Sequence, residues 1–333
     1  MPDTPSYPVV SVLCITYKHE KFLAQAIESV LIQETDFAVE MVIGEDCSPD
    51  GTRQIALDYE RRYPGRVRVL AHPQNIGIMP NVMATYAACR GEFIAFLEGD
   101  DYWTDPSKLQ QQVDALRAAP DCAMCFHDAK LAFDGPPPVQ GAPVLRAATF
   151  SEQFPNILPA LDQKGVPVRY TQVDVAKLGW FMPSASMLFR SRSLPRPLPA
   201  WVAGVFSGDY TLQLLSTRNG PALYLPRLMS VYRQHLGGVM YSLHNTLAQN
   251  ARRIFENKHY CRDIGSGMAS YFIPLLEHFY FERSEKLAAD GNRMLQLYYY
   301  GKAVSLSPGR FLYHVKRITR GMLGGTHSAN DAS

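Results

Sequence analysis

The first part of the chain repeats one pattern three times: a short apolar run, then a stretch whose apolar residues recur at helical spacing. The apolar runs lie at Val9–Tyr17, Ala38–Asp46 and Val67–Ala71, and the helical stretches at Glu20–Gln33, Thr52–Tyr63 and Pro80–Cys89. Strands that alternate with helices of this length favour a parallel sheet covered by its crossover helices. The pattern therefore predicts a Rossmann-like α/β fold with a mostly parallel central sheet and flanking helices.

A fourth apolar run, Phe93–Leu97, stops on three carboxylates, Glu98, Asp100 and Asp101. Five consecutive apolar residues predict a strand buried on both faces, so the acids emerge where open α/β sheets bind ligands. Carboxylates this close repel one another unless a cation compensates them, and Mg²⁺ or Mn²⁺ binds carboxylates together with phosphate oxygens. The stretch indicates a metal-bridged diphosphate. An acidic turn with an Asp at a helix N-cap ahead of Pro106 is the structural alternative.

Beyond this strand the pattern becomes irregular. The predicted elements are a strand at Ala123–Phe133, a loop at Gly135–Pro143, a short helix at Ser151–Leu161, a strand with an exposed start at Met182–Arg190, a helix at Asp209–Arg218 and two short strand pieces within Ala222–Arg233. From Asn245 onward the spacing is helical. We expect one domain at 1–244, with a donor half at 1–133 and an acceptor half at 134–244, then a helical C-terminal extension at 245–325 and a disordered tail at 326–333.

Composition and charge argue against several classes of protein. The chain of 333 residues is 47% apolar and 19% charged with a net charge of +2, so no strong positive field indicates a nucleic-acid partner. Its six cysteines are dispersed, which fits a reducing compartment, and the lone Cys122-x-x-Cys125 pair has no second pair with which to bind zinc. Neither a signal-peptide pattern nor a long uninterrupted apolar window occurs, which predicts a cytoplasmic protein.

Side chains at the ends of the predicted strands indicate a nucleotide groove. Thr16-Tyr17, Glu45-Asp46 and the acids after Leu97 follow strands that end at one edge of a parallel sheet. Tyr17 is suited to pack on a base, and Asp46 to accept a hydrogen bond from a base N–H or a ribose hydroxyl. Asp46 has a structural alternative, as an Asx-turn or N-cap acid in the sequence DCSPDG.

Taken together, these motifs resemble those of family 2 glycosyltransferases, a large group with the GT-A fold that transfers sugars from nucleotide donors. The similarity is carried, in this order, by SVLCITYKHEKFLAQAIESVLIQ, IGEDCSPDGT, HPQNIG, RGEFIAFLEGDDYW, GDYTLQLL and YRQHLGG. Within the family, the chain is similar to bacterial enzymes of polysaccharide assembly, such as O-antigen and capsule transferases.

The resemblance implies a donor site residue by residue. The implied nucleotide contacts are Thr16, Tyr17, Asp46 and Asn75. Glu98, Asp100 and Asp101 become a variant of the family's acidic motif, in which the first acid approaches the ribose or donor sugar and a later one binds the metal. Glu98 stands where Asp is more usual. The predicted ligands of Mg²⁺ or Mn²⁺ are Asp101, Asp100 and His235.

Two further positions have a functional and a structural interpretation. Asp209 is the predicted general base that deprotonates the acceptor hydroxyl, although an N-cap Asp explains its place at a helix start equally well. Gly208 stands where the family usually has Glu. His235 precedes Gly237-Gly238, where an ordinary loop histidine is the alternative to a metal ligand. Trp180 is a candidate platform for stacking of an acceptor sugar.

The end of the chain is basic. Residues 301–325 contain five Lys or Arg and no acid, and Arg310–Leu323 has its apolar residues on a helical stripe. This pattern is typical of a helix that lies on an anionic membrane surface, here the inner face of the cytoplasmic membrane, and it suits an enzyme with a lipid-linked acceptor. Packing on the body of the protein or on a partner subunit of a homo-oligomer explains it equally well.

The predicted activity is metal-dependent transfer of a sugar from a nucleoside diphosphate sugar to a hydroxyl of a glycan or lipid-linked glycan, with inversion at the anomeric carbon. Two other functions compete with it. A nucleotidyltransferase acting on sugar phosphates uses a similar sheet, but YKHEKF lacks the glycines of a triphosphate-binding loop. The other is a catalytically impaired sugar-nucleotide-binding protein, which the missing Glu at Gly208 keeps open.

Overall fold

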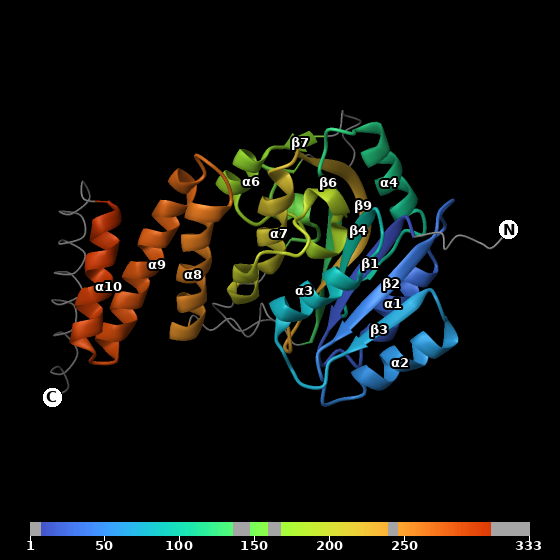
Figure 1. The fold of residues 1–333 in the computed structure, drawn as a ribbon, viewed down its shortest axis with the longest axis horizontal. Helices are drawn as coiled ribbons and strands as arrows, with labels where there is room; N and C mark the ends of the chain where they lie inside the picture. Colours follow the sequence, from blue (N-terminus) through green and yellow to red (C-terminus); the bar gives the residue numbers. More distant parts are fainter. Residues whose placement is uncertain (1–7, 136–146, 159–167, 239–245, 308–333) are drawn as a thin grey trace, which may run out of the picture. The chain divides into compact units, whose positions relative to one another are not determined.

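The computed structural model describes residues 8–135, 147–158, 168–238 and 246–307 (Figure 1). The chain divides into two compact units, Met1–His244 and Asn245–Ser333. We refer to them as the sheet unit and the helical unit.

The first half of the sheet unit alternates strands and helices. The strands are β1 (Val10–Thr16), β2 (Val39–Glu45), β3 (Val67–Ala71) and β4 (Phe93–Glu98), and the helices are α1 (Leu23–Leu31), α2 (Thr52–Arg62) and α3 (Ile78–Ala88). All four strands are parallel, in the order β3-β2-β1-β4. The predicted α/β fold with a mostly parallel sheet is confirmed.

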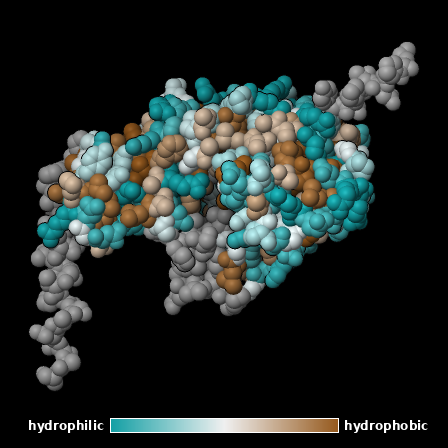
Figure 2. Space-filling view, turned by 60° about the horizontal axis from the view of Figure 1, so that its bottom comes forward, coloured by the Kyte–Doolittle hydropathy of each residue, from teal (hydrophilic) through white to brown (hydrophobic). Residues whose placement is uncertain are grey.

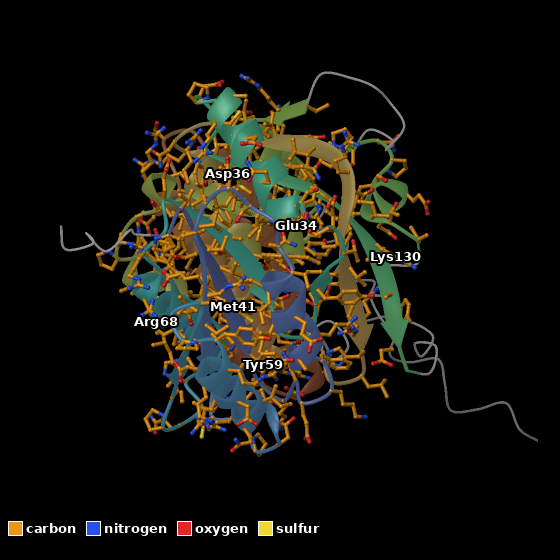
Figure 3. The ribbon with its side chains drawn as sticks, turned by 90° about the vertical axis from the view of Figure 1, so that its right-hand side faces the viewer. Glu34, Asp36, Met41, Tyr59, Arg68 and Lys130 are labelled. Carbon is orange, nitrogen blue, oxygen red and sulfur yellow. The ribbon has the colours of Figure 1, made fainter. Side chains whose placement is uncertain are left out.

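Apolar side chains from both faces of these strands build the core. One cluster lies between the sheet and α1, α2 and α4, and Met41 of β2 and Tyr59 of α2, both labelled in Figure 3, belong to it. β4 is buried from Phe93 to Leu97 and becomes partly exposed only at Glu98. This burial pattern places the change from apolar to acidic residues at the rim of the sheet, as the sequence predicts.

The second half of the sheet unit completes the sheet in the order β4-β8-β6-β9-β5, with β7 also paired to β9. Its strands are β5 (Tyr102–Trp103), β6 (Met124–Asp134), β7 (Val168–Tyr170), β8 (Leu188–Arg190) and β9 (Ala222–His235), and its α-helices are α4 (Lys108–Ala118), α5 (Phe150–Gln153), α6 (Gln172–Leu178) and α7 (Gly208–Thr217). β8 is antiparallel to both β4 and β6, and β9 is parallel to β6. The carboxyl end of β9 therefore points the same way as that of β4.

Two predictions for this half are wrong. Ala222–His235 forms one continuous strand rather than two pieces, because the register with β6 shifts after His127 and so accommodates Pro226, which has no N–H to donate. The segment Met182–Arg190 is buried throughout, and its predicted exposed start folds into a 3₁₀ helix, Ser184–Ser186. The Ser186 hydroxyl donates to the Pro183 carbonyl at 2.7 Å and so closes this turn.

The helical unit consists of α8 (Leu247–Asp263), α9 (Ala269–Ala289) and α10 (Arg293–Leu306). Its core contains Ile254, Leu276, Tyr280, Phe281 and Ala303. In Figure 2, hydrophobic and hydrophilic surface alternate over this unit. Among the described residues, no helix is long and apolar enough to cross a membrane. The predicted basic helix Arg310–Leu323 lies outside the described residues.

A buried lysine at the start of α4 lacks an acidic partner within hydrogen-bond distance. Lys108 is fully buried, and its Nζ donates to Gln112 Oε1 at 2.6 Å and lies 3.8 Å from the ring centroid of Trp103. Burial lowers the pKa of Lys108 from its ordinary 10.5 to about 7.

We expect this lysine to make stability depend on pH. Because its pKa is lower in the folded than in the unfolded chain, unfolding takes up protons between pH 7 and 10, and stability rises over that window by about 2–4 kcal/mol.

Lys108→Met lacks this rise, so its stability relative to the parent is greatest below about pH 7 and falls toward pH 10. Urea unfolding across this range measures the effect. Lys130→Met, at an exposed position of β6, is the control and keeps the parental pH dependence. Equal slopes for Lys108→Met and the parent contradict the prediction.

Candidate active site

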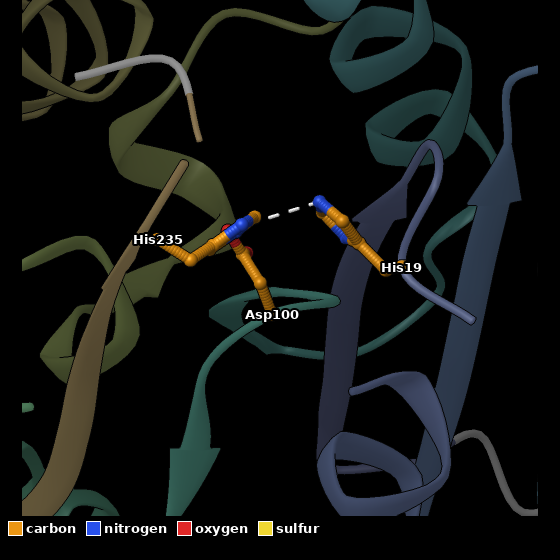
Figure 4. A group of neighbouring side chains, drawn as sticks. All are labelled: His19, Asp100 and His235. Carbon is orange, nitrogen blue, oxygen red and sulfur yellow. Dashed lines mark hydrogen bonds and ion pairs between the residues drawn. The ribbon is translucent and has the colours of Figure 1, made fainter. Parts of the chain in front are cut away.

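Three side chains meet where β1, β4 and β9 end (Figure 4). They are His19 in the loop after β1, Asp100 between β4 and β5, and His235, the last residue of β9. Nε2 of His235 lies 3.1 Å from Asp100 Oδ2, and Nε2 of His19 lies 3.7 Å from the same oxygen. One ligand atom from each residue lies within 4.8 Å of the other two, which is a suitable arrangement for one metal ion. We call these residues the His–Asp–His trio.

The surroundings of the trio fit a cation. Among the described residues, Thr16 Oγ1, His19 Nδ1, Asp100 Oδ1 and Asp101 Oδ2 are buried and have no hydrogen-bond partner. Buried polar atoms normally have partners, so a group of unpaired ones around three potential ligands indicates a bound species. Burial lowers the pKa of His19, which favours the neutral imidazole that metals bind. Burial raises the pKa of Asp100, but the His19 and His235 rings outweigh this and hold it below its ordinary value.

The trio contains two of the three predicted metal ligands, Asp100 and His235, and adds His19. Asp101 is not part of it. Its Oδ1 accepts a hydrogen bond from the backbone N–H of Arg233 at 2.7 Å, which joins the loop after β4 to the end of β9. The Arg233 guanidinium donates to the Asp100 carbonyl and to Gln25 Oε1, so the position of this loop is fixed from both sides.

Gly99 allows His19 to approach the loop after β4. A Cβ at this position would lie 2.6 Å from Thr16 Oγ1 and 2.9 Å from His19 Nδ1, distances that real Cβ atoms do not show. A side chain at position 99 therefore crowds both the Thr16 side chain and the His19 imidazole.

We expect Gly99→Ala to weaken Mn²⁺ binding by about tenfold, because it moves one of the trio away from the other two. Isothermal titration of the protein with Mn²⁺ measures the change. Gly301→Ala, in α10, is a matched control, since a Cβ there meets no atom within 4 Å. Unchanged Mn²⁺ affinity in Gly99→Ala would mean that His19 is not a ligand.

Glu98 lies beside the trio but serves a different contact. Its Oε2 accepts a hydrogen bond from Ser184 Oγ at 3.0 Å. Burial, followed by the charges of Asp100 and Asp209, raises the pKa of Glu98 to about 8. The extra methylene relative to Asp lets this carboxyl reach the 3₁₀ helix that precedes β8.

Asp46 and Asn75 hold the loop between β3 and α3 against the end of β2. Both Asp46 oxygens accept backbone N–H groups, from Ile76 at 2.7 Å and Gly77 at 2.9 Å, and Asn75 Nδ2 donates to the Asp46 carbonyl at 3.0 Å. The Asx-turn alternative for Asp46 is wrong, because its carboxylate binds this second loop and not its own turn. Beside it, the Tyr17 ring is 37% exposed, which leaves it accessible to a base.

Asp209 lies in the first turn of α7. The N-cap is Ser207, so the N-cap alternative for Asp209 is wrong. Asp209 Oδ1 accepts the Tyr210 N–H at 2.8 Å and Oδ2 accepts the indole N–H of Trp180. Burial raises the pKa of Asp209 above its ordinary value. A carboxylate with a raised pKa is better suited to accept a proton at neutral pH.

Gly208 leaves room for Met79, since a Cβ there would lie 2.1 Å from the Met79 sulfur. The methionine thus fills the space next to the position where similar enzymes carry Glu.

Tyr232 of β9 lies near Trp180, the residue that donates to Asp209, with 6.2 Å between the two ring centroids. Burial, then the charges of Glu98, Asp101, Asp209 and Asp100 in that order, raises its pKa well above 10. All four carboxylates therefore act on one phenol, which remains protonated. The sequence motif YRQHLGG contains this tyrosine, but no pattern within the motif singles it out. Trp180 contacts both Asp209 and Tyr232, and Tyr232 lies in the strand that ends at His235 of the trio.

The comparisons with known proteins match this architecture. The sequence profile described as glycosyl transferase family 2 matches residues 11–159. An uncharacterised protein of Mycobacterium tuberculosis is 30% identical over 268 residues, covering 80% of this chain and 68% of that protein. The putative teichuronic acid biosynthesis glycosyltransferase TuaG of Bacillus subtilis is 34% identical over 131 residues, covering 39% of this chain and 50% of TuaG.

Two solved structures share the fold. Residues 1–349 of TarS from S. aureus, in complex with UDP-GlcNAc, superpose with a TM-score of 0.58 at 16% identity, covering 90% of this chain and 82% of that one. The mannosyltransferase PcManGT from Pyrobaculum calidifontis, in complex with GDP-Man and Mn²⁺, gives a TM-score of 0.50 at 15% identity, covering 96% and 82%. At these identities the likeness extends to the fold alone.

Proposed function

Because the chain belongs to glycosyl transferase family 2, we propose that this glycosyltransferase moves one sugar from a nucleoside diphosphate sugar to a hydroxyl of a glycan or lipid-linked glycan. The proposed reaction inverts the anomeric carbon and depends on a divalent cation. The observation that carries this proposal is a candidate cation site where β1, β4 and β9 end, together with a candidate base, Asp209, that is held by the Trp180 indole.

The proposed reaction is a single displacement. The acceptor oxygen forms a bond to the anomeric carbon while the bond from that carbon to the diphosphate breaks, and the hydroxyl proton passes to the Asp209 carboxylate. The Trp180 indole donates to Asp209 Oδ2 and orients the carboxylate. The His–Asp–His trio would hold a divalent ion, which would supply positive charge to the departing diphosphate.

The ligand types favour Mn²⁺ over Mg²⁺. The trio offers two imidazole nitrogens and one carboxylate, and Mg²⁺ prefers oxygen ligands and retains its waters, whereas transition metals accept imidazole more readily. The Mn²⁺ bound to PcManGT supports this choice, and the donors bound to TarS and PcManGT support a nucleoside diphosphate sugar.

The proposed donor contacts are Thr16, Tyr17, Asp46, Asn75 and Glu98. TuaG supports an acceptor that belongs to a bacterial polysaccharide. We propose catalysis at the cytoplasmic face of the membrane, where a lipid-linked acceptor is available.

A panel of sugar nucleotides tests the proposal. UDP-, GDP- and dTDP-sugars are incubated with the protein and a lipid-linked or soluble glycan acceptor, with Mn²⁺, with Mg²⁺ and with EDTA, and release of nucleoside diphosphate is measured. We expect release with at least one donor, faster with Mn²⁺ than with Mg²⁺ and abolished by EDTA. Release of pyrophosphate from a nucleoside triphosphate plus a sugar phosphate would identify a nucleotidyltransferase instead. Donor-dependent thermal stabilisation without any turnover would identify a binding protein.

A further inference from the structure

The helical unit contains a pocket of about 230 Å³ to which all three of its helices contribute. Three cations and three tyrosines line it: Lys258, Arg283, Lys302, Tyr280, Tyr298 and Tyr299. No acidic side chain is among the lining residues. We propose that this pocket binds an anionic saccharide, that is, a sugar unit bearing a carboxylate or a phosphate.

The charge of the pocket is the first argument. Neither Lys258 nor Lys302 forms an ion pair with any residue that the structure describes. Two acids of this unit form ion pairs with other residues, Asp263 with Arg262 and Glu282 with Lys286. Like charges that share a small pocket repel one another, and a bound anion removes that cost.

The second argument is an unpaired donor. Arg283 Nη1 donates to the Leu247 carbonyl at 2.7 Å, but its Nε is buried and has no hydrogen-bond partner among the described residues. Because Arg283 lines the pocket and forms no ion pair with a described acid, its guanidinium adds an uncompensated positive charge for a carboxylate or phosphate.

The tyrosines distinguish a saccharide from a bare anion. Each cation lies over a different ring: Lys258 is 5.7 Å from the centroid of Tyr280, Arg283 is 4.9 Å from Tyr299 and Lys302 is 5.5 Å from Tyr298. Tyr298 is 55% exposed and is therefore accessible at the surface. Aromatic rings pack on the apolar face of a sugar while their hydroxyls bind its polar groups.

The size of the pocket limits what it holds. Pockets for drug-sized ligands span about 300–1,000 Å³, so this smaller one accommodates a single sugar unit of a longer chain rather than a whole nucleotide sugar. The proposed site is therefore separate from the donor site of the sheet unit, and it gives the protein a second contact with an acidic glycan.

Binding measurements with the full-length protein test this. Three ligands, trigalacturonic acid, maltotriose and inorganic phosphate, are titrated calorimetrically into three proteins. These are the parent chain, the double pocket variant Lys258→Ala/Lys302→Ala and the double control variant Arg262→Ala/Arg293→Ala. The control removes the same charge outside the pocket. We expect the parent to bind trigalacturonic acid at least about tenfold more tightly than maltotriose, and the pocket variant to lose about tenfold in affinity while the control keeps it within about twofold. Tyr298→Ala weakens trigalacturonic acid but not phosphate.

Several results would overturn the proposal. They are equal affinity for maltotriose and trigalacturonic acid, equal loss in the pocket and control variants, and binding of phosphate with no preference for the acidic sugar. Cosedimentation with phosphatidylglycerol vesicles that the pocket variant abolishes, without binding of the trisaccharide, would identify a lipid surface as the occupant instead.

Discussion

Asp209→Asn is expected to lower kcat for sugar transfer by about 10²–10⁴-fold, the usual contribution of a positioned general base. The amide has the size of the carboxylate, and its oxygen can still accept the Trp180 indole N–H, although the Tyr210 N–H then loses its side-chain acceptor; we expect the local fold and donor affinity to be retained. What is lost is the capacity to take the acceptor proton. Initial rates with a saturating donor, together with calorimetric titration of the nucleoside diphosphate, separate the two effects.

The control for this variant is Asp114→Asn, on the exposed side of α4, which is expected to leave both quantities unchanged. Trp180→Phe removes only the indole donor, and we expect it to lower kcat less than Asp209→Asn does, with donor affinity unaltered. If Asp209→Asn transfers sugar at the parental rate, the base lies elsewhere and the proposed direction of acceptor attack is wrong.

Asp100→Ala is expected to abolish Mn²⁺ binding and to lower the transfer rate by about 10²–10³-fold, the effect of removing one group that stabilises developing charge. Asp100 contributes the oxygen that both imidazoles face, at 3.1 and 3.7 Å, so no other residue of the trio can replace it. We expect the residual activity of the Asp100→Ala variant to be insensitive to EDTA. Mn²⁺ titration monitored by electron paramagnetic resonance gives the affinity independently of turnover.

Asp101→Asn is the matched comparison, because it neutralises the neighbouring carboxylate. The Asn oxygen can still accept the Arg233 N–H, so we expect a smaller loss of Mn²⁺ affinity than in Asp100→Ala. The opposite ranking, with Asp101→Asn losing the metal and Asp100→Ala keeping it, would return the ligand role to Asp101 and exclude the trio.

The sequence predicts the first half of the sheet well because its signals are local. Val67–Ala71 has the bounds of β3, and the apolar run before Glu98 is β4, since each is marked by a continuous apolar stretch with a turn at both ends. The same reasoning is wrong for Ala222–Arg233, where Pro226 reads as an interruption although a shift in register carries the strand past it.

The candidate site is less predictable because its contacts join distant segments. Nothing in YKHEKF shows that His19 faces Asp100, and nothing near Gly208 shows that Met79 fills the adjacent space. Asp46 illustrates the same limit. From the sequence it is interpreted either as a nucleotide contact or as an acid that stabilises its own turn. In the structure its carboxylate oxygens accept the backbone N–H groups of Ile76 and Gly77. Pairings of this kind depend on which strands become neighbours, a property of the complete sheet.

The order in which the trio appears along the chain also has a consequence for biosynthesis. His19 follows the first strand, whereas His235 ends the last strand of the sheet. During translation, most of the sheet unit must therefore leave the ribosome before the three side chains can meet, and the pairing of β9 with β6 is the step that brings the last one into place. A nascent chain interrupted before β9 has no complete trio, so the proposed cation site forms only when the sheet has closed.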